Sequence, residues 1–269
     1  RRPGEEPMNP SLAPTLRATR DAGKRLLVPY MTGGLGGPDW IEGLLAMAAA
    51  GADAIEVGIP FSDPAMDGPT IQEASQAALD GGATPAKILD SLRGVDVGVP
   101  LVAMTYYNIA FRMGHERFAS TLLESGISGA ILPDLPLEES ADWEKTAADV
   151  GVASILLAAP ITPDDRLAQI AARSRGFVYA VSLMGVTGER SSVASSAAEL
   201  AGRLKAVTDT PVLVGFGVST PEQAVEASKY SDGVIVASAL MRLLLDGRGT
   251  DAVGEAVRAM RVALDDADT

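Results

Sequence analysis

The sequence predicts an α/β fold in which eight parallel strands close into a (β/α)8 TIM barrel. Short apolar runs alternate with amphipathic segments along the chain, and such alternation implies a parallel sheet. Eight strand–helix units in 269 residues match the size of a closed barrel. An open, doubly wound sheet is the alternative architecture. We expect residues 1–10 to form a disordered tail and residues 11–269 to form a single TIM-barrel domain.

The expected elements follow in a regular order, read from apolar periodicity and from Gly and Pro at segment ends. An extra N-terminal helix at residues 11–22 precedes the barrel. Strands are expected at residues 26–31, 54–59, 100–104, 129–132, 153–157, 176–181, 211–214 and 233–236. Helices are expected at residues 38–50, 84–92, 117–124, 138–150, 164–172, 197–207, 221–228 and 240–245. A last helix places Val253, Val257, Met260 and Leu264 on one stripe.

The composition excludes several classes of protein. The chain has no Cys and a single His, which rules out a disulfide framework and argues against a zinc or iron–sulfur site, so no metal is expected. His115, at an expected helix start, is interpreted as a solvated surface residue. A net charge of −13 argues against nucleic-acid binding and suits a cytoplasmic protein. We find no apolar run of transmembrane length and no evident signal peptide.

The second expected strand carries an unusual carboxylate, Glu56. Both faces of a parallel strand are normally covered, so a carboxylate there is costly unless it is paired, neutralised or directed into a wet cavity. Glu56 is therefore a candidate acid or base. The structural alternative is a glutamate hydrogen-bonded to a neighbouring Ser or Tyr hydroxyl.

A loop rich in Pro and Gly follows this strand, at residues 60–70. It is longer than a minimal connection, and long loops in compact domains are usually functional. Asp63, between Ser62 and Pro64, is more typical of a turn than of catalysis. Asp67 suits either a turn before Gly68 or a position facing Glu56, and paired carboxylates in different environments can divide acid and base roles.

Three Gly-rich or small-residue corners follow the last three strands, at residues 185–188, 215–217 and 237–239. In such barrels a phosphate often binds the loops after strands seven and eight, at the start of a short extra helix. Close backbone approach and free N–H groups favour an anion, although each glycine could merely turn a corner. Residues 191–196 are small and polar, which suits a mobile lid or a simple connection. The candidate phosphate-binding residues are Thr187, Gly188, Gly215, Phe216, Gly217, Ala237 and Ser238.

Aromatic side chains gather at the expected strand ends, although aromatic residues make up only 4% of the chain. This concentration predicts a flat aromatic ligand between the carboxylates and the phosphate. Packing at the barrel mouth is the competing interpretation for any one of them. The residues are Tyr30, Phe61, Tyr106, Tyr179 and Phe216.

Residues 56–72, EVGIPFSDPAMDGPTIQ, resemble the signature of the tryptophan synthase alpha subunit family. Residues 104–108, 133–136, 185–188 and 215–217 resemble further blocks of that family in the expected order. The resemblance covers about residues 26–245. It implies retro-aldol cleavage of indole-3-glycerol phosphate into indole and glyceraldehyde 3-phosphate, in tryptophan biosynthesis.

Carried over by motif, Glu56 would protonate indole C3 and help to remove the hydroxyl proton of the glycerol chain. Asp67 would accept a hydrogen bond from the indole N–H, or its proton, and stabilise the indoleninium. The resemblance implies no cofactor in this chain. It implies a pyridoxal-phosphate-dependent beta subunit as partner, in an alpha2beta2 heterotetramer, with Asp63 and the segment from Asn108 to Met113 facing that partner.

The sequence departs from the family pattern at three places. Residues 32–36 read TGGLG, Ala237 stands where Gly is usual, and Leu183–Met184 stand where many members carry an Arg. The methyl group of Ala237 is expected to crowd the phosphate.

Two other functions are alternatives. One is another barrel enzyme for an indole or phosphoribosyl compound, such as indole-glycerol-phosphate synthase or phosphoribosylanthranilate isomerase, but no catalytic Lys stands at a strand end. The other is a degenerate subunit that only activates a beta partner, which the intact Glu56 and Asp67 oppose.

Overall fold

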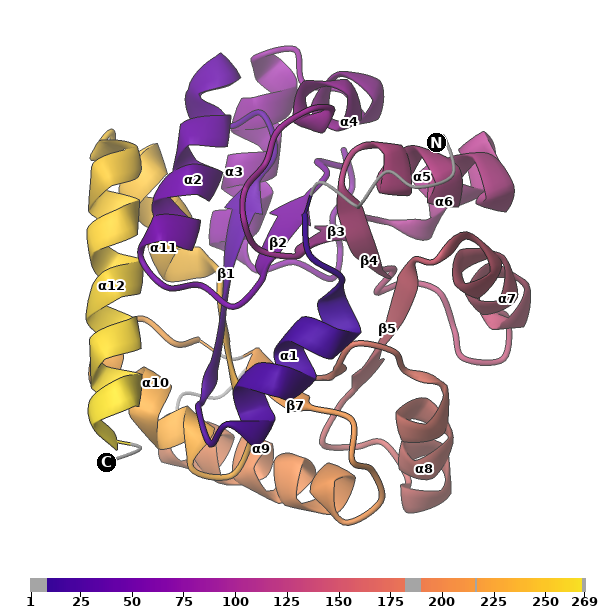
Figure 1. The fold of residues 1–269 in the computed structure, drawn as a ribbon, viewed down its shortest axis with the longest axis vertical. Helices are drawn as coiled ribbons and strands as arrows, with labels where there is room; N and C mark the ends of the chain where they lie inside the picture. The colour runs from indigo at the N-terminus through magenta and orange to yellow at the C-terminus, as the bar shows by residue number, and fades with distance from the viewer. Residues whose placement is uncertain (1–8, 182–189, 216, 268–269) are drawn as a thin grey trace.

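The computed structural model describes residues 9–181, 190–215 and 217–267. Eight parallel strands close into a barrel in the order of the sequence, as predicted, and helices surround it (Figure 1). The open doubly wound sheet is thereby excluded. The strands are β1 Leu26–Thr32, β2 Ile55–Gly58, β3 Leu101–Met104, β4 Ile127–Ile131, β5 Ala153–Ala158, β6 Val178–Val181, β7 Val212–Gly215 and β8 Gly233–Val236.

Most helices lie where the periodicity predicts them, including the extra N-terminal helix and the short helix after β8. They are α1 Leu12–Asp21, α2 Trp40–Ala49, α3 Pro69–Asp80, α4 Pro85–Leu92, α5 Tyr107–Met113, α6 His115–Glu124, α7 Ala141–Val150, α8 Asp164–Arg173, α9 Arg190–Lys205, α10 Pro221–Ser228, α11 Ser238–Leu245 and α12 Gly249–Ala267. A single turn of 3-10 helix, Gly37–Asp39, precedes α2.

Two helices were missed and one begins earlier than expected. Helix α3 starts at Pro69, directly after the Pro- and Gly-rich loop, and its buried face consists of Ile71, Ala74, Ser75 and Ala78, which gives a weak apolar signal. Helix α5 has only seven residues. Helix α9 begins at Arg190, so residues 191–196, interpreted as a lid or an irregular connection, are helical.

The N-terminal end of the barrel is closed by α1. Leu12 and Leu16 are fully buried and pack with inward-facing side chains of the strands. Gly129 and Gly176 leave the space that Leu12 fills, because a Cβ at either position would lie 2.8 or 2.5 Å from its Cδ2 atom. The interior at this end is therefore solid, which leaves the C-terminal end of the strands for a site.

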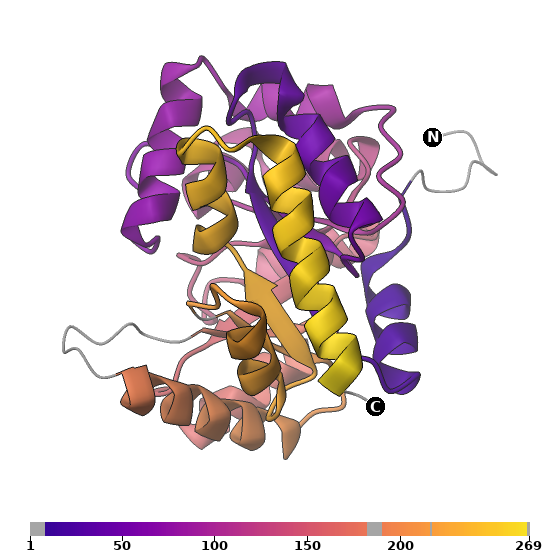
Figure 2. The same cartoon turned by 90° about the vertical axis from the view of Figure 1, so that its left-hand side faces the viewer.

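Helices α2, α10, α11 and α12 pack together along one side of the barrel. Figure 2 shows α12 crossing this side, with α10 and α11 next to it. The buried stripe of α12 consists of Val253, Gly254, Val257, Met260 and Leu264, as the periodicity predicted.

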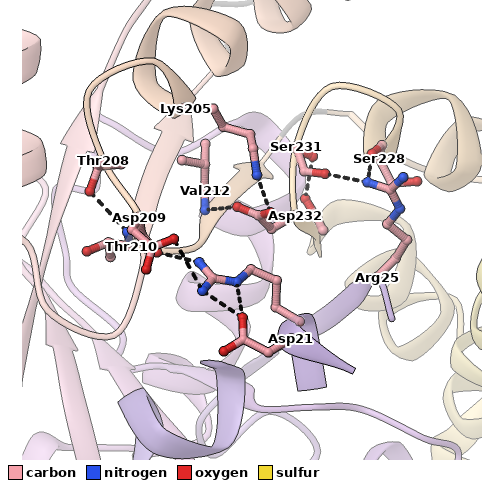
Figure 3. Close-up of polar contacts among 12 residues, drawn as sticks. Asp21, Arg25, Lys205, Thr208, Asp209, Thr210, Val212, Ser228, Ser231 and Asp232 are labelled. Atoms are coloured by element: carbon pink, nitrogen blue, oxygen red, sulfur yellow. Dashed lines mark hydrogen bonds and ion pairs between the residues drawn. The ribbon is translucent and has the colours of Figure 1, made fainter. Parts of the chain in front are cut away.

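Side chains also fix the N-terminal ends of strands through polar contacts (Figure 3). The carboxylate of Asp232, only 7% exposed, accepts a hydrogen bond from the backbone N–H of Val212 at 2.8 Å and pairs with Lys205. The Arg25 guanidinium donates to the carbonyl oxygens of Ser228 and Ser231, both at 2.8 Å. These contacts supply partners for backbone groups at the strand starts, at the end of the barrel away from the cavity.

Two sequence-based expectations require correction. Asn9 falls within the tail expected to be disordered, yet it is 2% exposed and exchanges hydrogen bonds with Val97 and Gly126. His115 is half-buried rather than a solvated surface residue: its Nε2 lies 3.0 Å from the Tyr107 hydroxyl and its ring packs edge-on against Trp143. Within the described ranges, none of the helices has the length and apolarity needed to cross a membrane.

Candidate active site

Glu56 lies in the middle of β2, in register with Tyr30 of β1 and Val102 of β3. Its side chain faces the barrel mouth and lines a cavity, yet the residue is only 1% exposed. Its Oε2 atom has no hydrogen-bond partner among the described residues. Burial, and secondarily the nearby Asp67 carboxylate, raise the pKa of Glu56 to about 8. Glu56 is therefore a buried acid that is protonated at neutral pH.

Asp67 lies in the β2–α3 loop, is half-buried and lines the same cavity. Its Oδ2 atom accepts a hydrogen bond from the Tyr106 hydroxyl at 3.1 Å. Burial raises the pKa of Asp67, and this hydrogen bond opposes the rise. The loop thus folds back over the strand end and brings Asp67 close enough to interact with Glu56.

Asp63, in the same loop, does not join the two carboxylates. It is exposed, and its Oδ2 atom accepts a hydrogen bond from the Ser62 hydroxyl at 2.7 Å. This local contact is typical of a turn.

The cavity has a volume of about 490 Å³, which suits a small organic ligand. Its walls are mostly apolar. Tyr30 and Tyr179, both expected to contact a ligand, line it. Phe61 and Tyr106 do not: they stack on each other beside it, with ring centroids 5.0 Å apart. The remaining apolar lining includes Met104, Leu157, Val181, Val218 and Ile235.

Sequence reasoning did not single out these aliphatic residues. Met104, Leu157 and Ile235 lie on strands that are mostly apolar on both faces, so the sequence shows no polar–apolar alternation that would assign them to the interior. Val181 and Val218 lie at or beyond strand ends, where periodicity gives no such signal.

Small residues that follow β7 and β8 form another part of the cavity wall. Gly215, Gly217, Ala237 and Ser238 line it, and α11 begins at Ser238. The first helical hydrogen bond runs from the N–H of Leu240 to the carbonyl of Ala237, so the amides of residues 238 and 239 precede it. An anion is favoured at such a helix start. Thr187, Gly188 and Phe216 lie outside the described residues.

Ala237 is accommodated by the backbone. Its φ of −121° lies outside the left-handed region, so the position does not require glycine.

Comparisons with known proteins identify the family. The family model described as "Tryptophan synthase alpha chain" matches residues 16–265. The chain belongs to the tryptophan synthase alpha chain family. The alpha chain of Streptomyces avermitilis is 46% identical over 252 residues, which cover 93% of this chain and 91% of the relative. The alpha chain of Streptomyces coelicolor is also 46% identical, and 93% of each chain is covered.

Solved structures agree with this assignment. A tryptophan synthase structure from M. tuberculosis, in its aminoacrylate-bound form, superposes with a TM-score of 0.85 at 36% identity, covering 95% of this chain and 100% of that chain. Tryptophan synthase subunit alpha from Legionella pneumophila gives a TM-score of 0.86 at 31% identity, covering 95% and 98%. This member of the family is a lyase of tryptophan biosynthesis that cleaves indole-3-glycerol phosphate to indole and glyceraldehyde 3-phosphate.

Proposed function

We propose that Glu56 and Asp67 together carry out the retro-aldol cleavage. Protonated Glu56 donates its proton to indole C3, which leaves a Glu56 carboxylate and a cationic indoleninium. The carboxylate then takes the proton of the hydroxyl on the adjacent carbon of the glycerol chain as the carbon–carbon bond breaks. The electron pair of that bond returns to the ring, the aldehyde of glyceraldehyde 3-phosphate forms, and Glu56 is protonated again.

Asp67 stabilises the intermediate in this proposal. Its carboxylate accepts a hydrogen bond from the indole N–H, and its negative charge offsets the positive charge that appears on the ring. An ion in a partly dry site interacts more strongly than in water, so this interaction favours the cationic intermediate over the neutral substrate.

We place the substrate lengthwise in the cavity. The indole ring lies between the apolar walls near Tyr30 and Tyr179, and the phosphate lies against the backbone of Gly215, Gly217 and Ser238. Hydrogen bonds to a charged group contribute about 1.5–3 kcal/mol each, which suffices to hold a phosphate on a chain of net negative charge. The proposal needs neither a metal nor an organic cofactor in this chain.

The observation that carries the proposal is the state of Glu56. A carboxyl with a pKa of about 8, an unpartnered Oε2 atom and a place on the wall of an apolar cavity is suited to give up and recover a proton near neutral pH. The described residues that line the cavity include no lysine, which disfavours the alternative barrel enzymes that rely on one.

We also propose that the C-terminal face of the barrel docks a beta subunit, giving an alpha2beta2 heterotetramer whose pyridoxal phosphate belongs to the beta subunit. Asp63 is exposed in the β2–α3 loop and Asn108 is exposed on α5, and both follow strands at this face. Large apolar side chains in connections or helices that follow strands at the same face are also exposed: Met66 is 61%, Phe111 65% and Ile161 80% exposed. Exposed apolar groups on one face are typical of a protein interface. We place this single-domain enzyme in the cytoplasm.

Glu56→Gln tests the catalytic assignment. The substitution keeps the shape of the side chain and removes the transferable proton, so we expect indole release to fall by at least about 10²-fold while the substrate still binds. Glu42→Gln, an exposed change on α2, is the matched control and should leave turnover unchanged. Near-normal turnover of Glu56→Gln rules out the assigned role. Partner activation without any cleavage by the wild-type chain would favour a degenerate subunit.

A further inference from the structure

Tyr106 occupies a position that the proposed chemistry does not use directly. It is the residue before α5, is only 6% exposed and does not line the cavity. Its hydroxyl nevertheless accepts a hydrogen bond from the N–H of Met66 at 2.9 Å and donates one to Oδ2 of Asp67 at 3.1 Å. One hydroxyl thus holds both the backbone beside Asp67 and its carboxylate.

The Tyr106 ring is itself fixed on two sides. It stacks on Phe61, at the start of the same loop, with an interplanar angle of 17°. The backbone beyond it is held because the N–H of Tyr107 donates to Oδ1 of Asp134 at 2.7 Å. A side chain held in this way fixes the groups it binds more precisely than a mobile loop alone could.

The start of the loop is joined to the end of β3 in the same region. The N–H of Ile59 donates to the carbonyl of Met104 at 2.9 Å, and the Thr105 hydroxyl donates to the carbonyl of Ile59 at 3.3 Å. Further along the loop, the backbone N–H of Met66 donates to the hydroxyl of Tyr106, which lies just after β3. Tyr106 thus ties the far limb of the loop to the end of β3.

We propose that Tyr106 is a positioning residue for the reaction: its hydrogen bond orients the Asp67 carboxylate toward the indole nitrogen and favours the charged form of that carboxylate. This inference rests on the proposed role of Asp67. It assigns to Tyr106 a function other than contact with the substrate.

The surroundings of Asp67 make this hydrogen bond important. The titratable groups near it are Glu56 on β2, Tyr30 on β1, Tyr179 on β6 and Tyr106 itself. Burial and the Asp67 carboxylate raise the pKa of the Tyr106 phenol, so it remains a protonated donor. Among these groups only the Tyr106 hydroxyl is hydrogen-bonded to Asp67 in the described residues, and it favours the charged form.

Tyr106→Phe tests the inference, because it keeps the stack on Phe61 and removes only the hydroxyl. We expect kcat for indole release to fall about tenfold with little change in KM, because one hydrogen bond to a charged group is lost. The acidic limb of the pH–rate profile should move to higher pH by about one unit, since Asp67 becomes harder to ionise. The alkaline limb, assigned to Glu56, should stay in place.

Tyr107→Phe is the matched control. It removes the neighbouring hydroxyl, whose partner is His115, and should leave both limbs unchanged. An unchanged kcat and acidic limb in Tyr106→Phe overturns the inference, as does an equal loss of kcat in both variants.

Asp67→Asn separates this inference from the proposed function. If Asp67→Asn turns over like the wild type, the role of Asp67 is wrong. If Asp67→Asn is inactive but Tyr106→Phe behaves like the wild type, only the positioning role is wrong. Should Tyr106→Phe not fold, Phe61→Leu loosens the ring and should move the acidic limb in the same direction by less, and an unmoved limb overturns the inference.

Discussion

The hydroxyl of Tyr30 covers Gly58, two residues beyond Glu56 on the neighbouring strand. A Cβ atom at Gly58 would lie 1.8 Å from that hydroxyl oxygen and 2.4 Å from the ring carbon that carries it. The same arrangement occurs on the other side of the barrel mouth, where a Cβ at Gly215 would lie 2.0 Å from the ring of Tyr179. The positions of Tyr30 and Tyr179 on the cavity wall therefore require glycine, which has no side chain, at residues 58 and 215.

Gly58→Ala should displace the Tyr30 ring from its place beside Glu56. We expect kcat/KM for indole-3-glycerol phosphate to fall by at least about tenfold, because a displacement of about 1 Å in an active site can lower the reaction rate by that factor or more. Steady-state kinetics of indole release measure the effect. Gly202→Ala, where a Cβ meets nothing within 4 Å, is the control. Equal kinetics in both variants would show that the Tyr30 position is unimportant.

The reaction should slow in alkaline solution. Because Glu56 must start protonated and its pKa is raised to about 8, kcat should be nearly constant around pH 7 and fall about tenfold per unit well above pH 8. Initial rates of indole release at saturating substrate give the profile. A kcat that stays constant far above pH 8 contradicts the assignment of Glu56 as the acid.

The stability of the fold should also depend on Glu56. Its pKa is raised from 4.5 to about 8, so the folded chain binds the proton more tightly than the unfolded chain does. The contribution of Glu56 protonation to the free energy of unfolding is therefore fully present below about pH 4.5 and is lost as pH rises through about 8. Denaturant unfolding measured across this range should show the loss.

Glu56→Gln should remove this dependence. At a pH above the raised pKa we expect the variant to exceed the wild type by about 2 kcal/mol in the free energy of unfolding, after allowing for relaxation and water entry around the carboxylate. The control is again Glu42→Gln. A wild-type advantage at that pH would mean that the Glu56 carboxylate is not destabilised by burial.

A negative charge at the start of α11 should exclude the substrate phosphate. We expect Ser238→Asp to raise KM by at least about tenfold, because like charges in a partly dry site repel strongly. Inhibition of the wild type by inorganic phosphate should be competitive and should disappear in the variant. Ser11→Asp introduces the same charge at the opposite end of the barrel and serves as control. An unchanged KM in Ser238→Asp would place the phosphate elsewhere.

The exposed ring of Phe111 tests the proposed docking face. Phe111→Ser should weaken the complex with a beta subunit by about 1–3 kcal/mol while leaving cleavage by the isolated chain unchanged. Calorimetric titration with a beta subunit measures the change. Val262→Ser, on α12 and 52% exposed, is the matched control. Equal affinities of both variants would exclude Phe111 from the interface.

Local patterns were sufficient to predict the barrel, because each strand is a short apolar run and each covering helix buries a periodic stripe. They were insufficient for α3 and α5. The buried face of α3 is mostly alanine and serine, and α5 is too short for its period to show. Glu56 and Asp67, the proposed catalytic pair, could be selected as candidates from the sequence, since a carboxylate in a buried strand and a long loop after it are visible without coordinates.

The sequence by itself therefore determined the number and order of the strand–helix units and the candidate residues for the proposed chemistry, because those depend on composition and spacing. Only the tertiary structure decided which of the aromatic residues reach the cavity. Tyr30 and Tyr179 enter it over glycines of neighbouring strands, whereas Tyr106 turns to Asp67 and stacks on Phe61. Such choices depend on contacts between residues far apart in the chain, and no local pattern records them.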